Sequence, residues 1–345
     1  MLSEVQVQTI HGHCLAILES TGIAVQHAAA LKILAEKGAR VDLAAQRAYF
    51  PPALVERSLA AIPKSFVCGG RDPEFDFTVA YDAPPICRCT GGAVNLLDLA
   101  TNESRAVTLQ DCRDIARLVD ALPNTAFAAS QTPCDALLPV WDIQVLKEML
   151  ASGRKHIWTL VSSSKNLAYQ LEMMLAVAGS AEALARRPIG HGIVTVLEQF
   201  HFPEDEIERL LQYGRYKIPV KVPIVPMMGT NAPTTIAGAM VQSNAEAVAS
   251  AVLIDLLCPG TPTWYYFFIQ AMEKRTGGNV FMSPEIALCS LGLIQMARRY
   301  RLPAAPSSFE TTGARIADVV YGNGMSVNLF ALAGAFENAS TGCVD

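Results

Sequence analysis

The sequence predicts a (β/α)8 barrel, the TIM barrel fold, preceded by a helical cap. From about residue 86 onward, short apolar runs alternate with longer segments of helical periodicity. Such alternation predicts right-handed β-α-β units and a parallel sheet. There are eight of these runs, and several are apolar throughout, as expected for strands covered on both faces. Eight units favour closure into a barrel over an open sheet.

The predicted strands are the apolar runs 86–91, 125–131, 156–162, 189–197, 220–228, 263–269, 303–309 and 336–340. The predicted helices between them are 109–121, 136–152, 165–178, 204–214, 232–257, 284–300 and 316–333. Residues 95–107 insert after the first strand and predict a hairpin that turns at Thr101 and Asn102.

The first part of the chain predicts helices in front of the barrel. Residues 5–20 and 28–37 have helical spacing and end at glycines. Pro51 and Pro52 open a short helix at 53–61, and 65–68 follows as a strand. We therefore expect residues 1–80 to form a helical cap and residues 81–345 to form the barrel.

Composition excludes several classes of protein. The net charge of −5 argues against a nucleic-acid scaffold, which usually has a basic face. The nine cysteines are scattered without a C-x-x-C pair, so we expect no metal site and free thiols in a reducing cytosol. No signal peptide or membrane-spanning run is recognised, which predicts a cytoplasmic protein without a membrane partner. Neither glycine-rich phosphate fingerprint occurs, which disfavours a nucleotide-binding sheet.

In barrels of this type the site lies at the carboxyl ends of the strands. Glu198 and Glu310 follow the fourth and seventh strands there, and Phe200, Tyr266 and Phe268 are nearby aromatic residues. Aromatic faces with a carboxylate suit a quaternary ammonium, which has no N–H to donate. The alternative is that the aromatic residues are barrel core and the acids are solvated loop residues.

Four further residues at these strand ends are candidates for the site. His201 is a candidate for acid–base catalysis, and the alternative is that it is an exposed loop histidine. Gln131 is a candidate polar orienter, and Met228 ends the fifth predicted strand. Gly91 either lets a backbone approach a ligand or allows a tight bend.

Several segments carry a resemblance to a known family. They include Pro226-Met-Met-Gly-Thr-Asn-Ala-Pro-Thr-Thr-Ile-Ala-Gly238, then Ser243-Asn-Ala-Glu246, Arg275-Thr-Gly277 and Ser283-Pro-Glu285. In order and spacing the chain resembles the trimethylamine methyltransferase family, in particular its non-pyrrolysine branch, which includes glycine-betaine methyltransferases. The resemblance implies a barrel that presents a methylated amine to a Co(I) corrinoid carried by a separate small protein.

The chain also differs from the pattern of this family at several positions. Pyrrolysine-containing members use that residue near the end of the seventh strand, at about Thr311 here, and no amine nucleophile stands there. A quaternary amine needs none, because its leaving group is a neutral tertiary amine. Tyr266, Phe267 and Glu198 depart from the family pattern, so the pocket is expected to be reshaped. Relatives continue beyond the eighth strand, so the eighth helix and a C-terminal region are expected to be missing. The chain is then a fragment, an unusual short member, or a homo-oligomer that covers the exposed barrel surface, and a homo-oligomer is expected.

Two other functions stay open on the sequence. One is a different barrel enzyme that uses Glu198 and Glu310 as an acid and base pair. The other is a truncated, non-catalytic paralogue that only binds a ligand or partner.

Overall fold

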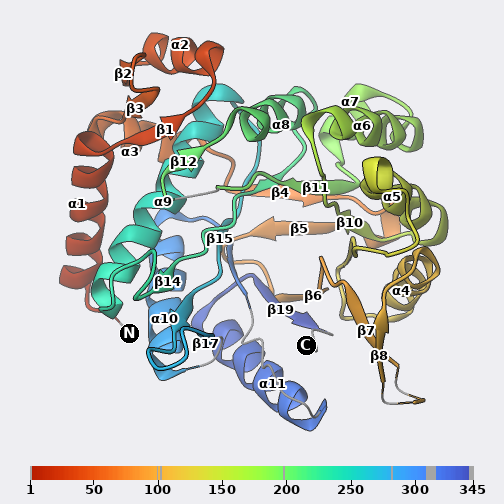
Figure 1. The fold of residues 1–345 in the computed structure, drawn as a ribbon. Coiled ribbons are helices and arrows are strands. Elements are labelled where there is room, and N and C mark those ends of the chain that lie inside the picture. The colour runs from red at the N-terminus through yellow and green to blue at the C-terminus, as the bar shows by residue number, and fades with distance from the viewer. Residues whose placement is uncertain are drawn as a thin grey trace.

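The alternation of strand and helix is present in the structure, a computed structural model (Figure 1). The structure describes residues 2–98, 100–101, 103–196, 199–280, 283–307 and 316–341. This part of the chain is mixed α/β and contains eleven α-helices.

Each of the eight predicted apolar runs contains a strand. These strands are β6 (Ile86–Cys89), β9 (Phe127–Ala129), β10 (His156–Trp158), β11 (Gly190–Ile193), β13 (Val220–Lys221), β15 (Tyr265–Phe267), β18 (Ala304–Pro306) and β19 (Glu337–Thr341). The seven helices between them are α4 (Leu109–Ala121), α5 (Trp141–Ser152), α6 (Ser164–Ala178), α8 (Glu204–Arg215), α9 (Ile236–Leu257), α10 (Pro284–Tyr300) and α11 (Ile316–Ala333). The predicted helix 136–152 is divided into the short turn η2 (Leu138–Val140) and α5, and one short helix that was not predicted, α7 (Ala181–Arg186), follows α6.

The eight strands run parallel to their neighbours. β9, β10, β11 and β13 form one parallel sheet, and β15–β18 and β19–β6 are parallel pairs. Single parallel bridges at Cys87–Thr125 and Val220–Thr263 connect these groups. The Phe336 amide donates to the Ala304 carbonyl over 2.9 Å, which connects β18 with the start of β19. No sheet made by the described strands closes on itself, since these connections are isolated.

The fifth predicted strand, 220–228, is interrupted. Pro223 and Pro226 lack an N–H to donate to a neighbouring strand, so regular pairing ends after Lys221. The chain stays extended and pairs again as β14 (Met227–Met228), alongside β16 (Gln270–Met272), which pairs in turn with β17 (Asn279–Val280).

The N-terminal region has the three expected helices, α1 (Glu4–Ser20), α2 (Ala28–Glu36) and α3 (Pro52–Ala61). It is not purely helical, because a small sheet lies among them. That sheet has the order β12 (His201–Phe202), β1 (Ile23–Val25), β3 (Arg47–Tyr49) and β2 (Arg40–Asp42). α1, α2 and α3 all contact α9, so the N-terminal helices and the long helix share one apolar core.

Two hairpins flank the parallel strands. β4 (Ser65–Cys68), the turn η1 (Pro73–Phe75) and β5 (Phe77–Ala80) form the first, and Gly69 at its bend hydrogen-bonds Pro188 and His156. Those contacts place it against the amino ends of β10 and β11. β7 (Asn95–Asp98) and β8 (Glu103–Ala106) form the second, as predicted, although Asn102 lies outside the described residues.

α9 is the one helix in the described ranges that is long and apolar enough to cross a membrane by length and composition. Of its most apolar stretch, 83% is buried inside the structure, as expected of a core helix. It packs against α1, α3 and α10 (Figure 1).

Candidate functional site

A buried ion cluster lies between the parallel strands. The ammonium of Lys221 on β13 lies 2.7 and 2.6 Å from the two carboxylate oxygens of Glu337 on β19. Arg88 on β6 donates from Nε to the same carboxylate over 2.7 Å. All three side chains are buried, so each charge depends on the others for compensation.

The ammonium of Lys221 is surrounded by aromatic faces. Its Nζ lies 4.8 to 5.4 Å from the ring centres of Trp264, Phe127, Tyr266 and Trp158. Such contacts are cation–π interactions. Burial lowers the pKa of Lys221 to about 8, against the opposing effect of Glu337. The protein thus supplies its own cation to the aromatic cluster that contains Tyr266.

A neutral histidine pair lies beside this cluster. Burial lowers the pKa of His156 to about 4 and that of His191 well below its usual value. His156 Nδ1 lies 3.0 Å from the Gly69 carbonyl, so it carries the proton and donates. His156 Nε2 then accepts from His191 Nδ1 over 2.9 Å. His191 is therefore a core histidine.

A small cavity opens where three neighbouring parallel strands end. Its volume is about 260 Å³, near the lower end of ligand pockets. Its lining residues follow β11, β13 and β15 or, in the case of Glu246, come from the middle of α9: Val196, Gln199, Pro223, Val225, Met227, Asn231, Glu246 and Gln270. In open or closed parallel sheets alike, ligands bind at the carboxyl ends of strands. This cavity is therefore the candidate site.

The charged group of the cavity is Glu246. It lies in the middle of α9, where most residues of the helix are buried. The residue is 5% exposed, and one carboxylate oxygen accepts a hydrogen bond from Gln242 over 3.0 Å. Burial raises the pKa of Glu246 to about 7, and the Gln242 hydrogen bond opposes this only in part.

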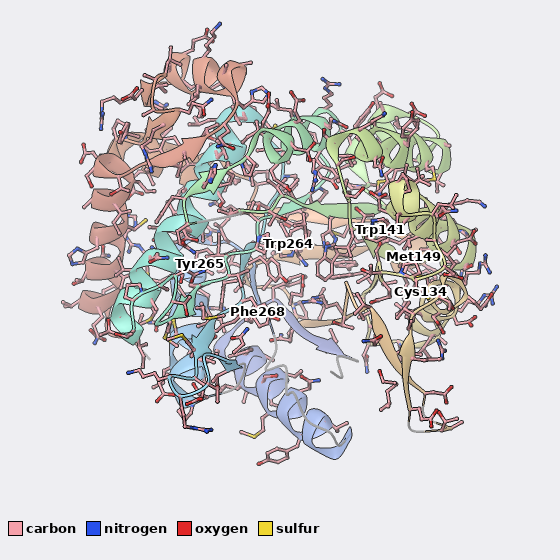
Figure 2. All side chains as sticks on the ribbon, in the orientation of Figure 1. Cys134, Trp141, Met149, Trp264, Tyr265 and Phe268 are labelled. Atoms are coloured by element: carbon pink, nitrogen blue, oxygen red, sulfur yellow. The ribbon has the colours of Figure 1, made fainter. Side chains whose placement is uncertain are left out.

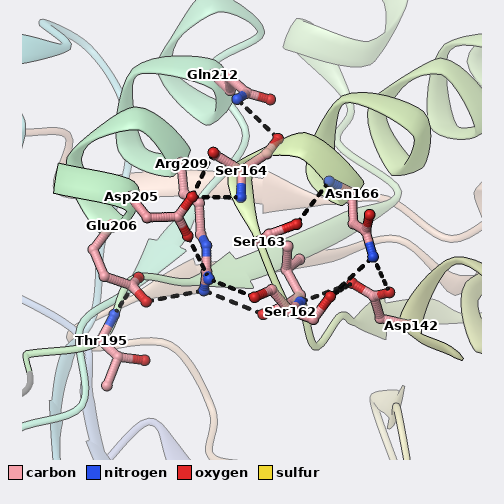
Figure 3. Close-up of polar contacts among 11 residues, drawn as sticks. Asp142, Ser162, Ser163, Ser164, Asn166, Thr195, Asp205, Glu206, Arg209 and Gln212 are labelled. Carbon is pink, nitrogen blue, oxygen red and sulfur yellow. Dashed lines mark hydrogen bonds and ion pairs between the residues drawn. The ribbon is translucent and has the colours of Figure 1, made fainter. Parts of the chain in front are cut away.

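A polar network holds the loops that lead to the cavity (Figure 3). Asp142 accepts from the amide and hydroxyl of Ser162, which fixes the loop after β10. Arg209 donates to the carbonyl of Ser162 and pairs with Glu206. The second oxygen of Glu206 accepts from the Thr195 amide over 2.8 Å, which fixes the loop after β11 next to Val196.

Two predicted site residues have structural contacts near the ion cluster. The amide of Gln131 donates to the carbonyls of Thr90 and Ala129, and its oxygen accepts from the Ala93 amide. These three bonds hold the turn that contains Gly91. A Cβ at Gly91 would lie 3.1 Å from Trp158, so the glycine allows close packing against that ring.

Three other predicted residues lie toward the helices and the N-terminal sheet. Met228 is buried and packs in the main apolar core. His201 pairs with Ala24 of β1, so it belongs to a strand and not to an exposed loop. Phe200 has a positive φ of 58°, and its carbonyl accepts from the Ala24 amide over 2.7 Å.

The aromatic residues of the sixth predicted strand divide between two faces. Trp264, Tyr266 and Phe268 alternate, so they share the face that carries the ion cluster. Tyr265 faces the other way, and its hydroxyl donates to Asn244 on α9 over 2.8 Å. Figure 2 shows Trp264 among the strands and Tyr265 on the side of α9. Phe268 is only partly buried, and it lies one step closer to the carboxyl end than Tyr266.

Glu198, Glu310 and Thr311 lie outside the described residues. Sequence reasoning did not select Glu246 as a site residue, although Glu246 ends one of the segments that carry the family resemblance. The available signal was an acid in the middle of a long helix that is rich in apolar residues, since such a charge is rarely buried without a purpose.

The fold is similar to that of monomethylamine methyltransferase MtmB from Methanosarcina barkeri. That solved structure aligns with a TM-score of 0.67 at 10% identity, covering 99% of this chain and 70% of the other. At this identity the likeness concerns the fold alone.

The chain is also similar in sequence to methyltransferases of known name, including the following two. Trimethylamine methyltransferase MttB of Desulfitobacterium hafniense is 28% identical over 303 residues, which is 88% of this chain and 61% of that protein. Glycine betaine methyltransferase of Desulfitobacterium hafniense is 26% identical over 306 residues, covering 88% of this chain and 63% of that protein. The chain thus spans about three fifths of the length of these relatives. The family model of trimethylamine methyltransferase (MTTB) matches residues 1–339, and the chain therefore belongs to the trimethylamine methyltransferase family.

Proposed function

We propose that this protein takes a methyl group from a quaternary methylated amine and gives it to a corrinoid carried by a separate protein. The observation that carries the proposal is the small cavity at the carboxyl ends of β11, β13 and β15, with the buried carboxyl of Glu246 in its wall. Among the relatives, glycine betaine methyltransferase is named for a quaternary amine and supports this substrate class, whereas trimethylamine methyltransferase is named for a tertiary amine.

The chemistry asks little of the protein beyond holding and orienting the amine. The methyl–nitrogen bond breaks, and the nitrogen keeps the electron pair and becomes a neutral tertiary amine. No proton moves, so neither an acid nor an amine nucleophile is required. The corrinoid, when docked, supplies a Co(I) nucleophile as methyl acceptor. The rim residue Val225 is 40% exposed, which suits an approach from outside the cavity.

We retain the predicted site residues as parts of this proposal. Phe268 extends the face of Trp264 and Tyr266 toward the carboxyl ends, which supports contact with the substrate. Gln131 would act by holding the turn at Gly91 rather than by direct contact, since its amide is bonded to backbone groups. The remaining proposed contacts are Glu198, Phe200, His201, Met228, Tyr266, Glu310 and Thr311.

We also propose that the eight parallel strands form a closed (β/α)8 barrel over residues 81–345, with residues 1–80 as its cap. The bridges from β6 to β9 and from β13 to β15, with the Phe336–Ala304 hydrogen bond, support closure. A reducing cytoplasmic location is supported by the eight described cysteines, which are all free. Self-association stays a prediction, tested by the molar mass in solution.

The test is methyl transfer from a panel of betaines and methylamines to Co(I) cobalamin, followed by absorbance. We expect transfer from at least one quaternary amine and none from monomethylamine. Absence of transfer from every quaternary amine, with cobalamin or with a corrinoid protein, would reject the activity and leave the fold in place.

A further inference from the structure

Glu246 is a buried acid without a cationic partner. Within the described part of the chain no lysine, arginine or histidine forms an ion pair with it, and its one side-chain hydrogen bond comes from the neutral amide of Gln242. Burying a carboxylate without compensation is unfavourable, so such groups usually pair, bind a ligand or become neutral.

The cavity supplies no compensating charge either. Apart from Glu246, its lining consists of apolar and amide side chains: Val196, Gln199, Pro223, Val225, Met227, Asn231 and Gln270. The amide oxygens of Asn231 and Gln270 are already used, by the Met227 amide and by Asn279. No cationic group lies in this lining, so the carboxyl is either protonated or, in its charged form, compensated by a positive charge that a ligand brings.

We propose that Glu246 is the counter-charge for a small quaternary ammonium bound in this cavity. The inference rests on the proposed function and deepens it by naming the group that recognises the charge. It differs from the ion cluster around Lys221, where the protein provides both signs itself.

The apolar walls fit this ligand class. A quaternary nitrogen has no N–H to donate, so it needs a nearby negative charge and contact with methyl groups, not directed acceptors. Val196, Val225 and Met227 provide apolar contact in the same cavity that holds the carboxyl. A volume of about 260 Å³ admits only a small ligand. A carboxyl whose pKa lies near 7 is charged at pH 8, and a bound cation stabilises that form.

The experiment measures binding of choline and of its uncharged isostere, 3,3-dimethylbutan-1-ol, to the full chain by calorimetry at pH 8 without any corrinoid. We expect the wild type to prefer choline, and Glu246→Gln to weaken choline binding about tenfold or more while leaving the alcohol unchanged. Glu182→Gln removes an exposed charge far along the chain and should bind as the wild type does.

Wild type that prefers the alcohol or binds no quaternary ammonium, or Glu246→Gln with unchanged choline affinity, would overturn the inference. A second readout needs no variant: choline affinity of the wild type should fall as pH drops below about 7, because the carboxyl takes up a proton. A pH-independent affinity would also overturn it. If choline binds with this dependence on Glu246 and on pH but no methyl transfer is found, the proposed activity is rejected and the role of Glu246 as counter-charge stands.

Discussion

The ammonium of Lys221 and the carboxylate of Glu337 meet inside the protein, with 2.7 and 2.6 Å between the nitrogen and the two oxygens. Each side chain is 1% exposed, and they stand 116 residues apart in the chain. Arg88 shares the carboxylate, so the cluster holds two cations and one anion. Glu337 is therefore the residue on which the balance of charge depends.

Because two cations share one anion, removing the anion should destabilise the protein more than removing one of the cations. Glu337→Gln leaves two buried cations without compensation and should lower the free energy of unfolding by about 3–5 kcal/mol. Lys221→Met leaves the neutral Arg88–Glu337 pair and keeps an apolar stem among the rings, so its effect should be clearly smaller. Urea unfolding followed by circular dichroism measures both. Equal losses, or a larger loss for Lys221→Met, would contradict this account, and Glu172→Gln at an exposed position of α6 serves as the charge control.

Replacing Gln131 should also lower stability, in this case through the loss of hydrogen bonds to backbone groups. Its side chain satisfies the carbonyls of Thr90 and Ala129 and the amide of Ala93. Gln131→Ala removes all three hydrogen bonds, although the Thr90 carbonyl keeps the Cys89 thiol as a donor, and should lower the free energy of unfolding by about 3 kcal/mol. Gln110→Ala, at an exposed position of α4, should change it little. If Gln131→Ala unfolds at the wild-type urea concentration, the turn does not depend on this side chain.

A side chain at position 192 should destabilise the protein by a steric clash. A Cβ at this position would overlap the ring of Tyr213, a fully buried residue of α8. Gly192→Ala should therefore lower the free energy of unfolding by about 1–3 kcal/mol. A matched substitution, Gly12→Ala, meets nothing within 4 Å in α1 and should raise stability slightly, since alanine favours a helix. If the clash is the cause, the double variant Gly192→Ala with Tyr213→Leu should lose less free energy of unfolding than the two single variants lose in total.

The fold could be predicted wherever the signal is local. The helix at 109–121 has the predicted bounds because Thr108 and Asp111 cap each other and its apolar face is regular. The strand formed by His201 could not be predicted, because its partner Ala24 is 177 residues away and neither segment is long enough to show a period. The sequence predicts that Tyr266 contacts the substrate, because it lies near the carboxyl end of the predicted strand 263–269. The sequence did not reveal that Lys221, on another strand, faces the same ring.

Glu246 predicts how stability changes with pH. Burial raises its pKa from the ordinary value of 4.5 to about 7, so the folded protein holds this proton more tightly than the unfolded chain does. The resulting stabilisation is complete below pH 4.5 and is lost as pH rises to about 7, a change of about 3 kcal/mol. Glu246→Gln removes this titration. The difference in free energy of unfolding between wild type and Glu246→Gln should therefore fall by that amount between pH 4 and 8, because the other titrating groups cancel. Saturating choline should reduce the fall, since it stabilises the charged form. A difference that stays constant with pH would mean that the carboxyl has an ordinary pKa, and the argument for a ligand that compensates its charge would lose its energetic basis.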